Sequence, residues 1–165
     1  MYDFLLRPRM LIAGLAATLL VAGCAAPVSA PPSPPVKETP KCQAAAPGDA
    51  LVGNWLSVRK QKGVAGELRT LFTLHPDGTM AYTEQLKRGK NPSQGIDEAG
   101  CWRRDQQTLV LQTLLSNGAP IEANDPIYTN RYAIVSASGQ VLNLKAPGGA
   151  AIKAKRMSPG YRLPF

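Results

Sequence analysis

Aromatic residues, histidine and closely spaced cysteines are scarce in this chain, and each scarcity excludes a class of protein. Phe, Trp and Tyr make up 6% of the 165 residues, whereas Gly and Pro contribute 15 each. A large helical core or a two-domain enzyme is therefore not expected, and turns should be frequent. The one histidine and the three cysteines, which form no Cys-x-x-Cys pair, supply neither a zinc site nor a redox motif. We expect one small domain without a metal ion or cofactor.

Residues 1–23 have the pattern of a secretion signal. Arg7 and Arg9 precede an apolar run from Met10 to Ala22, which suits a signal peptide and is shorter than the roughly 20 residues of a membrane-spanning helix. The run ends in Val21-Ala22-Gly23-Cys24, which resembles the lipobox of bacterial lipoproteins. That resemblance implies cleavage before Cys24, its acylation with palmitate-type chains and a membrane anchor. Because Ala25 is not the Asp that retains such proteins in the inner membrane, it also implies the periplasmic face of the outer membrane.

Residues 24–48 form a linker rich in proline and alanine. Seven prolines are interleaved with Ala and Ser between Ala25 and Ala50, a composition that cannot bury enough apolar surface to fold. As an extended polyproline II chain of about 3.1 Å per residue, residues 25–40 would hold the following domain up to roughly 50 Å from the lipid. We therefore expect a disordered, passive tether without a partner of its own.

Cys42 and Cys101 are predicted to form a disulfide. With Cys24 acylated, they are the two remaining thiols in an oxidising compartment. The bond would close a loop of about 59 residues and stabilise the fold by roughly 4 kcal/mol. Two free thiols are the alternative, since spacing alone does not show that the Cα atoms lie within bridging distance.

Residues 49–159 show short runs of alternating apolar and polar residues separated by turn-forming segments such as Pro76-Asp77-Gly78. Lys87 to Gly95 is expected to be a polar basic loop, and residues 160–165 a C-terminal tail. An antiparallel up-and-down barrel is the economical arrangement, because closure leaves no exposed edge strand. The predicted fold is all-β and small, with eight strands over residues 51–58, 68–74, 79–86, 100–104, 108–115, 127–136, 141–146 and 151–157.

Three motifs support this fold through a resemblance. Gly53-x-Trp55, Phe72-x-x-x-Pro76-Asp77-Gly78-Thr79 and Gly100-x-Trp102 resemble the small lipocalin-like (calycin-type) domains of bacterial envelope proteins, over residues 49–159. The resemblance implies that Trp55 closes the barrel floor and stacks under a basic residue of the last strand, by position Arg156 or Lys155. A barrel of this size is either filled by side chains or holds one small ligand.

Four residues are candidates for a ligand site in the barrel. Tyr128 and Tyr132 lie four positions apart in a predicted strand and therefore share a face with Asn130. If that face is interior, the three side chains line a polar pocket, and if it is exterior they form a solvent-facing stripe. Trp102 could stack on a sugar or fatty ligand or belong to the core.

The domain is also basic. From Asp49 onward, 15 basic residues stand against 9 acidic ones, a net charge of +6. Lys87, Arg88 and Lys90 form a candidate anion-binding rim, which would concentrate anions from an envelope rich in phosphate and carboxylate groups. A solubilising surface is the alternative.

Two functions remain open from the sequence. The first is a binding module for a small apolar or anionic ligand, such as an envelope lipid or glycolipid. The second is a structural or assembly partner of another envelope protein, with a solidly packed barrel. Nucleic acid is not an expected partner, because the signal exports the protein and no phosphate-binding or RNA-binding motif occurs. An enzyme is not expected either, because His75 lies beside a tight turn and no nucleophile motif such as Gly-x-Ser-x-Gly occurs.

Overall fold

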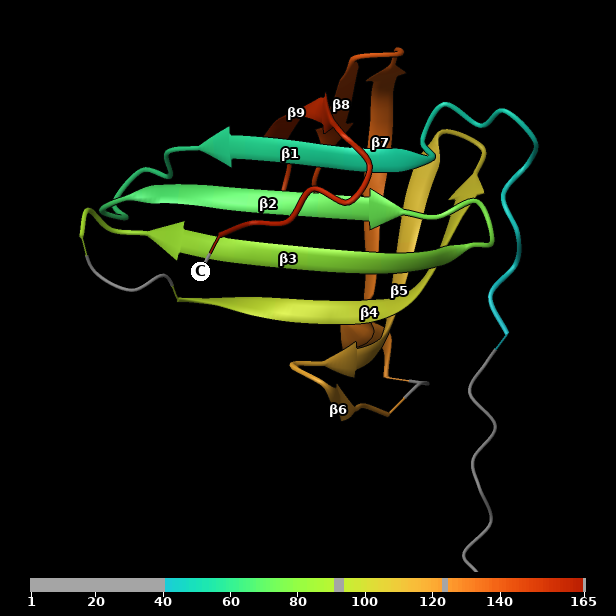
Figure 1. Cartoon of the computed structure of the whole chain (residues 1–165), viewed down its shortest axis with the longest axis horizontal. Coiled ribbons are helices and arrows are strands. Elements are labelled where there is room, and N and C mark those ends of the chain that lie inside the picture. The colour runs from blue at the N-terminus through green and yellow to red at the C-terminus, as the bar shows by residue number, and fades with distance from the viewer. Residues whose placement is uncertain (1–40, 91–93, 123–124, 165) are drawn as a thin grey trace, which may run out of the picture. The chain divides into compact units, whose positions relative to one another are not determined.

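The computed structural model describes residues 41–90, 94–122 and 125–164, which form an all-β barrel (Figure 1). The predicted signal peptide, Cys24 and most of the linker lie outside the described residues. A two-residue strand, β6 (Ala119–Pro120), and a short 3-10 helix, η1 (Pro126–Tyr128), interrupt the series of longer strands. The barrel strands are β1 (Gly53–Arg59), β2 (Glu67–Leu74), β3 (Thr79–Lys87), β4 (Gln94–Asp105), β5 (Thr108–Ser116), β7 (Thr129–Ala137), β8 (Val141–Lys145) and β9 (Ala151–Met157).

The eight long strands pair antiparallel in sequence order, and β1 closes the ring by pairing with β9. The predicted eight-stranded up-and-down barrel is therefore confirmed. In Figure 1, β1 to β4 run side by side across the view, and β5 and β7 to β9 cross behind them. Closure leaves no long unpaired edge among these eight strands, which protects the barrel from edge-to-edge association.

Strand alternation sends one set of side chains into a single core. Trp55 pairs with Phe72, Leu109 with Tyr132, and Leu144 with Ile152, so these residues all face inward. The fully buried members include Trp55, Phe72 and Leu109, each 0% exposed. The described residues thus contain the whole barrel and its core, and we take the domain that begins at Lys41 to fold on its own.

Three strands begin two or more residues away from the predicted position: β1, at Gly53 rather than Leu51, and β4 and β7. β4 begins at Gln94 rather than Gly100, because residues 94–99 continue the ladder with β3 up to the pair Leu86 and Gln94. The basic loop after β3 is accordingly shorter than predicted. β7 begins at Thr129 rather than Ile127, because the Asp125 carboxylate accepts the Ile127 amide and caps η1.

The two ends of the barrel differ in construction. At one end, here named the floor, the chain from Cys42 to Val52 meets the turns between β2 and β3, β4 and β5, and β7 and β8. At the other, here named the loop end, lie the described parts of the connections after β1, β3, β5 and β8, namely residues 60–66, 88–90, 117–122, 125–128 and 146–150. The floor is held by covalent and buried contacts, whereas the loop end carries most of the longer connections.

Arg156 and Trp55 close the floor. The Arg156 guanidinium lies 4.1 Å from the centre of the Trp55 ring, and its Nη1 and Nη2 donate to the carbonyl oxygens of Val52 and Ala50 at 2.8 and 3.0 Å. A Cβ atom at Gly53 would collide with Arg156 Nη1, and Gly53 also has a φ of +134°. The glycine of Gly53-x-Trp55 is therefore required by the cation that covers the tryptophan. Arg156, not Lys155, occupies the position that the resemblance implied.

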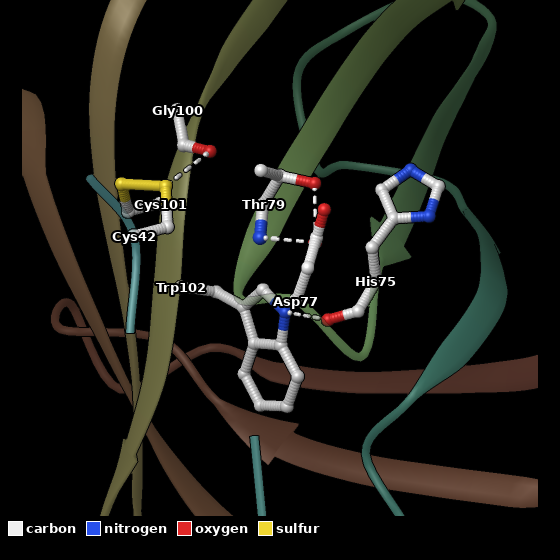
Figure 2. Close-up of a disulfide and its surroundings, with 7 residues drawn as sticks. All are labelled: Cys42, His75, Asp77, Thr79, Gly100, Cys101 and Trp102. Carbon is white, nitrogen blue, oxygen red and sulfur yellow. Dashed lines mark hydrogen bonds between the residues drawn. A yellow bond between two sulfur atoms is a disulfide. The ribbon is translucent and has the colours of Figure 1, made fainter. Parts of the chain in front are cut away.

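The predicted disulfide is confirmed. Cys42 and Cys101 are bonded, with their Cα atoms 5.2 Å apart, and Figure 2 shows the bond beside the turn between β2 and β3. The Ala45 amide donates to the Pro76 carbonyl at 2.9 Å, which continues the attachment of this segment to the same turn. The bond therefore joins the start of the domain to β4.

Candidate functional site

Two basic loops lie next to each other at the loop end. A Cβ atom at Gly66, in the β1–β2 loop, would meet the Lys87 carbonyl oxygen and Arg88 Cγ, so this loop touches the end of β3. The predicted residues Lys87, Arg88 and Lys90 are thereby joined by a second basic group from the β1–β2 side. We name this set the basic rim: Arg59, Lys60, Lys62, Lys87, Arg88 and Lys90.

Most of the basic rim is open to solvent. Lys60, Lys62, Arg88 and Lys90 are exposed, and Lys87 is half-buried. Glu67, which lies opposite Lys87 on β2, is bonded to Arg69 at 3.1 Å. Clustered cations that face solvent raise the local concentration of anions, so the rim is suited to attract phosphate or carboxylate groups.

A layer of polar side chains lies inside the barrel next to the rim. Glu84 Oε2 accepts hydrogen bonds from Thr70 Oγ1 at 3.0 Å and from the Tyr82 hydroxyl at 2.9 Å. Arg59 Nη2 lies 3.7 Å from the same oxygen, and the Arg59 and Glu84 side chains are 30% and 26% exposed. Thr70 beneath them is 1% exposed. The layer is thus reachable from the loop end as far as the Arg59–Glu84 pair.

Two tyrosines extend this layer toward the core. Burial is the largest cause that raises the pKa of Tyr82 far above its usual range, and Tyr132 and Glu84 add to the effect. Burial likewise raises the pKa of Tyr132, although its hydrogen bond with Tyr82 acts in the opposite direction. Both rings meet Phe72 edge-on, with centroids 5.3 and 5.7 Å away. Both phenols therefore stay protonated at neutral pH, and the Tyr82 hydroxyl donates to Glu84 within an aromatic setting.

Arg59 has one donor without an acceptor. Its Nη1 atom is buried and has no hydrogen-bond partner among the described residues. An unpaired buried donor is costly, and more so on a charged group. An acceptor oxygen from a bound molecule would satisfy this atom, and the exposed part of the side chain lies where such a molecule would enter.

The predicted ligand residues separate in the structure. Tyr132 and Asn130 pair with Leu109 and Leu111 of β5 and face inward, so the interior reading of this face is correct for them. Tyr128 belongs to η1 and does not share their strand face. Trp102 is 2% exposed, and its Nε1 donates to the His75 carbonyl at 2.8 Å (Figure 2). Of its two expected positions, Trp102 therefore takes the core one, where it braces a turn.

Arg103, Arg104 and Arg156 lie away from the basic rim. Arg103 and Arg104 lie at the floor end of β4, where Arg104 Nη1 is 3.4 Å from Asp49 Oδ1. Arg156 is committed to Trp55. Lys153 and Lys155 are exposed on the outer side of β9.

Sequence reasoning missed the acidic and hydroxyl members of the inner layer. Thr70, Tyr82 and Glu84 face inward with Glu98, which accepts a hydrogen bond from Thr113 Oγ1 at 3.0 Å. One signal was available, since alternation in residues 79–86 places Met80, Tyr82 and Glu84 on one face. A carboxylate on the same face as a core methionine marks a polar position inside the barrel.

Comparison with protein-family models and with curated proteins found no match to this chain. Among the described residues, no helix is both long and apolar enough to cross a membrane. Within the same part of the chain, no three His, Cys, Asp or Glu side chains are grouped as a metal site would need. The features that indicate a function are therefore the barrel, the basic rim and the sequence motifs.

Proposed function

We propose that this protein is an outer-membrane lipoprotein that faces the periplasm and binds an anionic or partly apolar envelope ligand at the loop end of its barrel. The lipobox-like Val21-Ala22-Gly23-Cys24 supports the anchor, and the Cys42–Cys101 disulfide is consistent with an oxidising compartment. The ligand class is a molecule with phosphate or carboxylate groups, such as an acidic lipid or glycolipid headgroup.

One observation carries this proposal. Two loops that are about 25 residues apart in sequence converge at one end of the barrel and place six cations above the polar layer. Arg59 connects the two parts, since it belongs to the rim and directs an unpartnered donor inward. A charge distribution that served only solubility would not require the β1–β2 loop to meet the end of β3 beside an arginine whose buried Nη1 has no partner among the described residues.

Vesicle co-sedimentation tests the rim. The domain that begins at Lys41 is mixed with vesicles of phosphatidylcholine and phosphatidylglycerol at low and high ionic strength. The triple variant Lys87→Glu, Arg88→Glu, Lys90→Glu should bind at least about tenfold more weakly at low salt, where screening is weakest. Its stability should stay close to that of the wild type, because exposed charges contribute little.

A charge-matched control distinguishes a site from net charge. The triple variant Arg103→Glu, Arg131→Glu, Lys155→Glu makes the same change in charge at exposed positions closer to the floor than to the rim. It should lose much less binding than the rim variant. Equal losses in the two variants, or binding that does not depend on salt, would reject the rim as the binding site.

A structural or assembly role is the second candidate, and the packed core favours it. Phe72, Leu111 and Leu142 are among the inward residues that are at most 2% exposed, so side chains occupy much of the interior. Native mass spectrometry of the domain purified from the periplasm separates the two candidates. A co-purified small molecule supports the binding module, whereas a bare mass together with a protein cross-linked at the rim supports the assembly role.

A further inference from the structure

The chain's own C-terminal segment lies over part of the outer face of the layer formed by β1 to β4. Residues 160–163 cross this face after β9, and Figure 1 shows the segment running in front of β1 and β2. Asn54 Nδ2 donates to the Ser158 carbonyl at 2.9 Å and holds the start of the segment. Leu163 is 4% exposed, as is Leu71, which faces outward from β2. The part of this face around Leu71 is thus apolar and partly sealed, with Thr73, Thr83 and Asp97 as polar neighbours, unlike a typical solvent-facing side of a barrel.

A cavity of about 450 Å³ lies between this segment and the sheet. Its apolar base is formed by Ala81 and Ala99, which lie opposite each other on β3 and β4, and by Leu71 on the neighbouring strand β2. Leu163 is part of the cover. A β-bulge between Ala99 and Gly100 shifts the register with β5 and pairs Leu115 with Ala99, which turns Leu115 outward. Leu115 remains 39% exposed and lines the same cavity. The irregularity therefore supplies an additional apolar wall.

The next row of the same face contains two unpartnered donors. Arg69 of β2 lies opposite Gln85 of β3, and Gln85 lies opposite Gly95 of β4. This row is next to the row of Leu71, Thr83 and Asp97, which line the cavity. Arg69 Nε and Gln85 Nε2 are buried and have no hydrogen-bond partner among the described residues. Gln85 is only 1% exposed. Two adjacent buried donors, one of them on a cation, indicate a missing acceptor oxygen.

We propose that this outer groove binds a single aliphatic chain that ends in a carboxylate or ester carbonyl, of the long-chain fatty acid class. The chain would lie over Leu71, Ala81 and Leu115, and its oxygen would accept from Arg69 Nε and Gln85 Nε2. The volume lies at the lower end of the roughly 300–1,000 Å³ of small-molecule sites, which suits one chain better than a two-chain lipid. A peptide that adds a strand is disfavoured, because β2, β3 and β4 are paired on both sides and offer no free edge. This site is separate from the basic rim and does not depend on it.

Isotope-filtered NMR of the wild-type domain locates the ligand. Uniformly ¹³C-labelled palmitate is added to the domain that begins at Lys41, below the concentration at which palmitate forms micelles. We expect saturable binding of one equivalent and NOEs from the chain methylenes to the methyl groups of Leu71 and Leu163. NOEs to Leu109 and Leu142, in the barrel core, would place the ligand inside the barrel and overturn the proposal, as would the absence of saturable binding.

Two variants test the groove and the acceptor position separately. Ala81→Phe should fill the groove and weaken palmitate binding by at least about tenfold, while Ala151→Phe, exposed on β9, should not. The double variant Arg69→Met, Gln85→Leu should weaken binding by about tenfold through loss of the charged and amide donors. If methyl palmitate binds as well as palmitate, the site takes acyl esters, and if it binds much more weakly, the site takes free acids. Unchanged binding in the double variant would refute the acceptor position. If Ala81→Phe does not fold, the wild-type NOEs decide the location.

Discussion

Breaking the Cys42–Cys101 bond should destabilise the domain strongly, and by the same amount from either side. Cys42→Ser and Cys101→Ser remove the same cross-link between the start of the domain and β4. The bond spans 59 residues of sequence, and chain-entropy theory for a loop of about that size gives roughly 4 kcal/mol at 25 °C. The loss arises because the unfolded chain becomes less restricted, so it should not depend on which sulfur is removed.

The disulfide also holds the segment from Lys41 to Pro47 against the floor, which is a local contribution to stability. With the bond intact, the Ala45 amide donates to the Pro76 carbonyl at 2.9 Å, and Ala45 packs against the core cluster. In the variants this segment can detach without global unfolding, because Lys41 to Pro47 contains no strand. We therefore expect early local detachment, followed by cooperative unfolding of the barrel.

Urea titration of the domain that begins at Lys41, monitored by near-ultraviolet circular dichroism, measures the effect. Both variants should lose about 4 kcal/mol, equivalent to roughly 10–20 °C in Tm, and should show a larger urea dependence because the unfolded chain exposes more surface. Reduced wild-type protein serves as the control and should match both variants. Losses that differ by more than about 1 kcal/mol between the variants, or a reduced wild type that keeps its full stability, would refute the reasoning.

Three further changes have definite expected outcomes. Trp55→Ala should lower the free energy of unfolding by about 3–5 kcal/mol, because it empties the core and leaves the Arg156 guanidinium without its ring; a loss below about 1 kcal/mol in urea titration would contradict a packed floor. Tyr82→Phe should flatten the fall in stability above pH 10: burial raises the pKa of this phenol above its usual value of 10.0, so the unfolded state loses the proton first and wild-type stability declines as pH rises. Thermal unfolding measures the stability of both proteins against pH. If the two curves run parallel above pH 10, Tyr82 is not the cause of the decline. Cys24→Ser in the full chain should release the protein from the membrane fraction and abolish labelling by a radioactive fatty acid, and continued labelling would disprove the lipoprotein proposal.

Local sequence rules predicted most of the strands correctly. In residues 79–86 the alternation of side chains and the preceding Pro76-Asp77-Gly78 turn depend on neighbours in the chain. The structure agrees in detail, since Asp77 Oδ1 accepts from the Thr79 amide at 2.9 Å and from its hydroxyl at 2.7 Å. These hydrogen bonds also lower the pKa of Asp77. Such short-range contacts are fully specified by a few adjacent residues.

The fourth strand shows where local rules become insufficient. Residues 94–99 contain two glycines or alanines and adjacent acids, Asp97 and Glu98, and show no clear alternation. They form a strand because β3 lies alongside. The two strands pair from Cys101, opposite Thr79, to Gln94, opposite Leu86. Pairing with β3 outweighs the weak β propensity of residues 94–99. Without them, the backbone N–H and C=O groups along this edge of β3 would have no hydrogen-bond partner.

The amino-acid sequence by itself determined the all-β class and most of the turns, and it predicted the pairing of Cys42 with Cys101, for which the structure supplied the bridging distance. Only the tertiary structure decided that Arg59 and Lys87 belong to one end of the barrel, that Trp102 serves the core, and that Leu115 turns outward beside the C-terminal segment. The physical reason is that alternation specifies which face a residue takes along its own strand. Which faces and ends meet depends on register and closure between strands far apart in the chain, and a one-residue shift in that register moves every side chain to the opposite face.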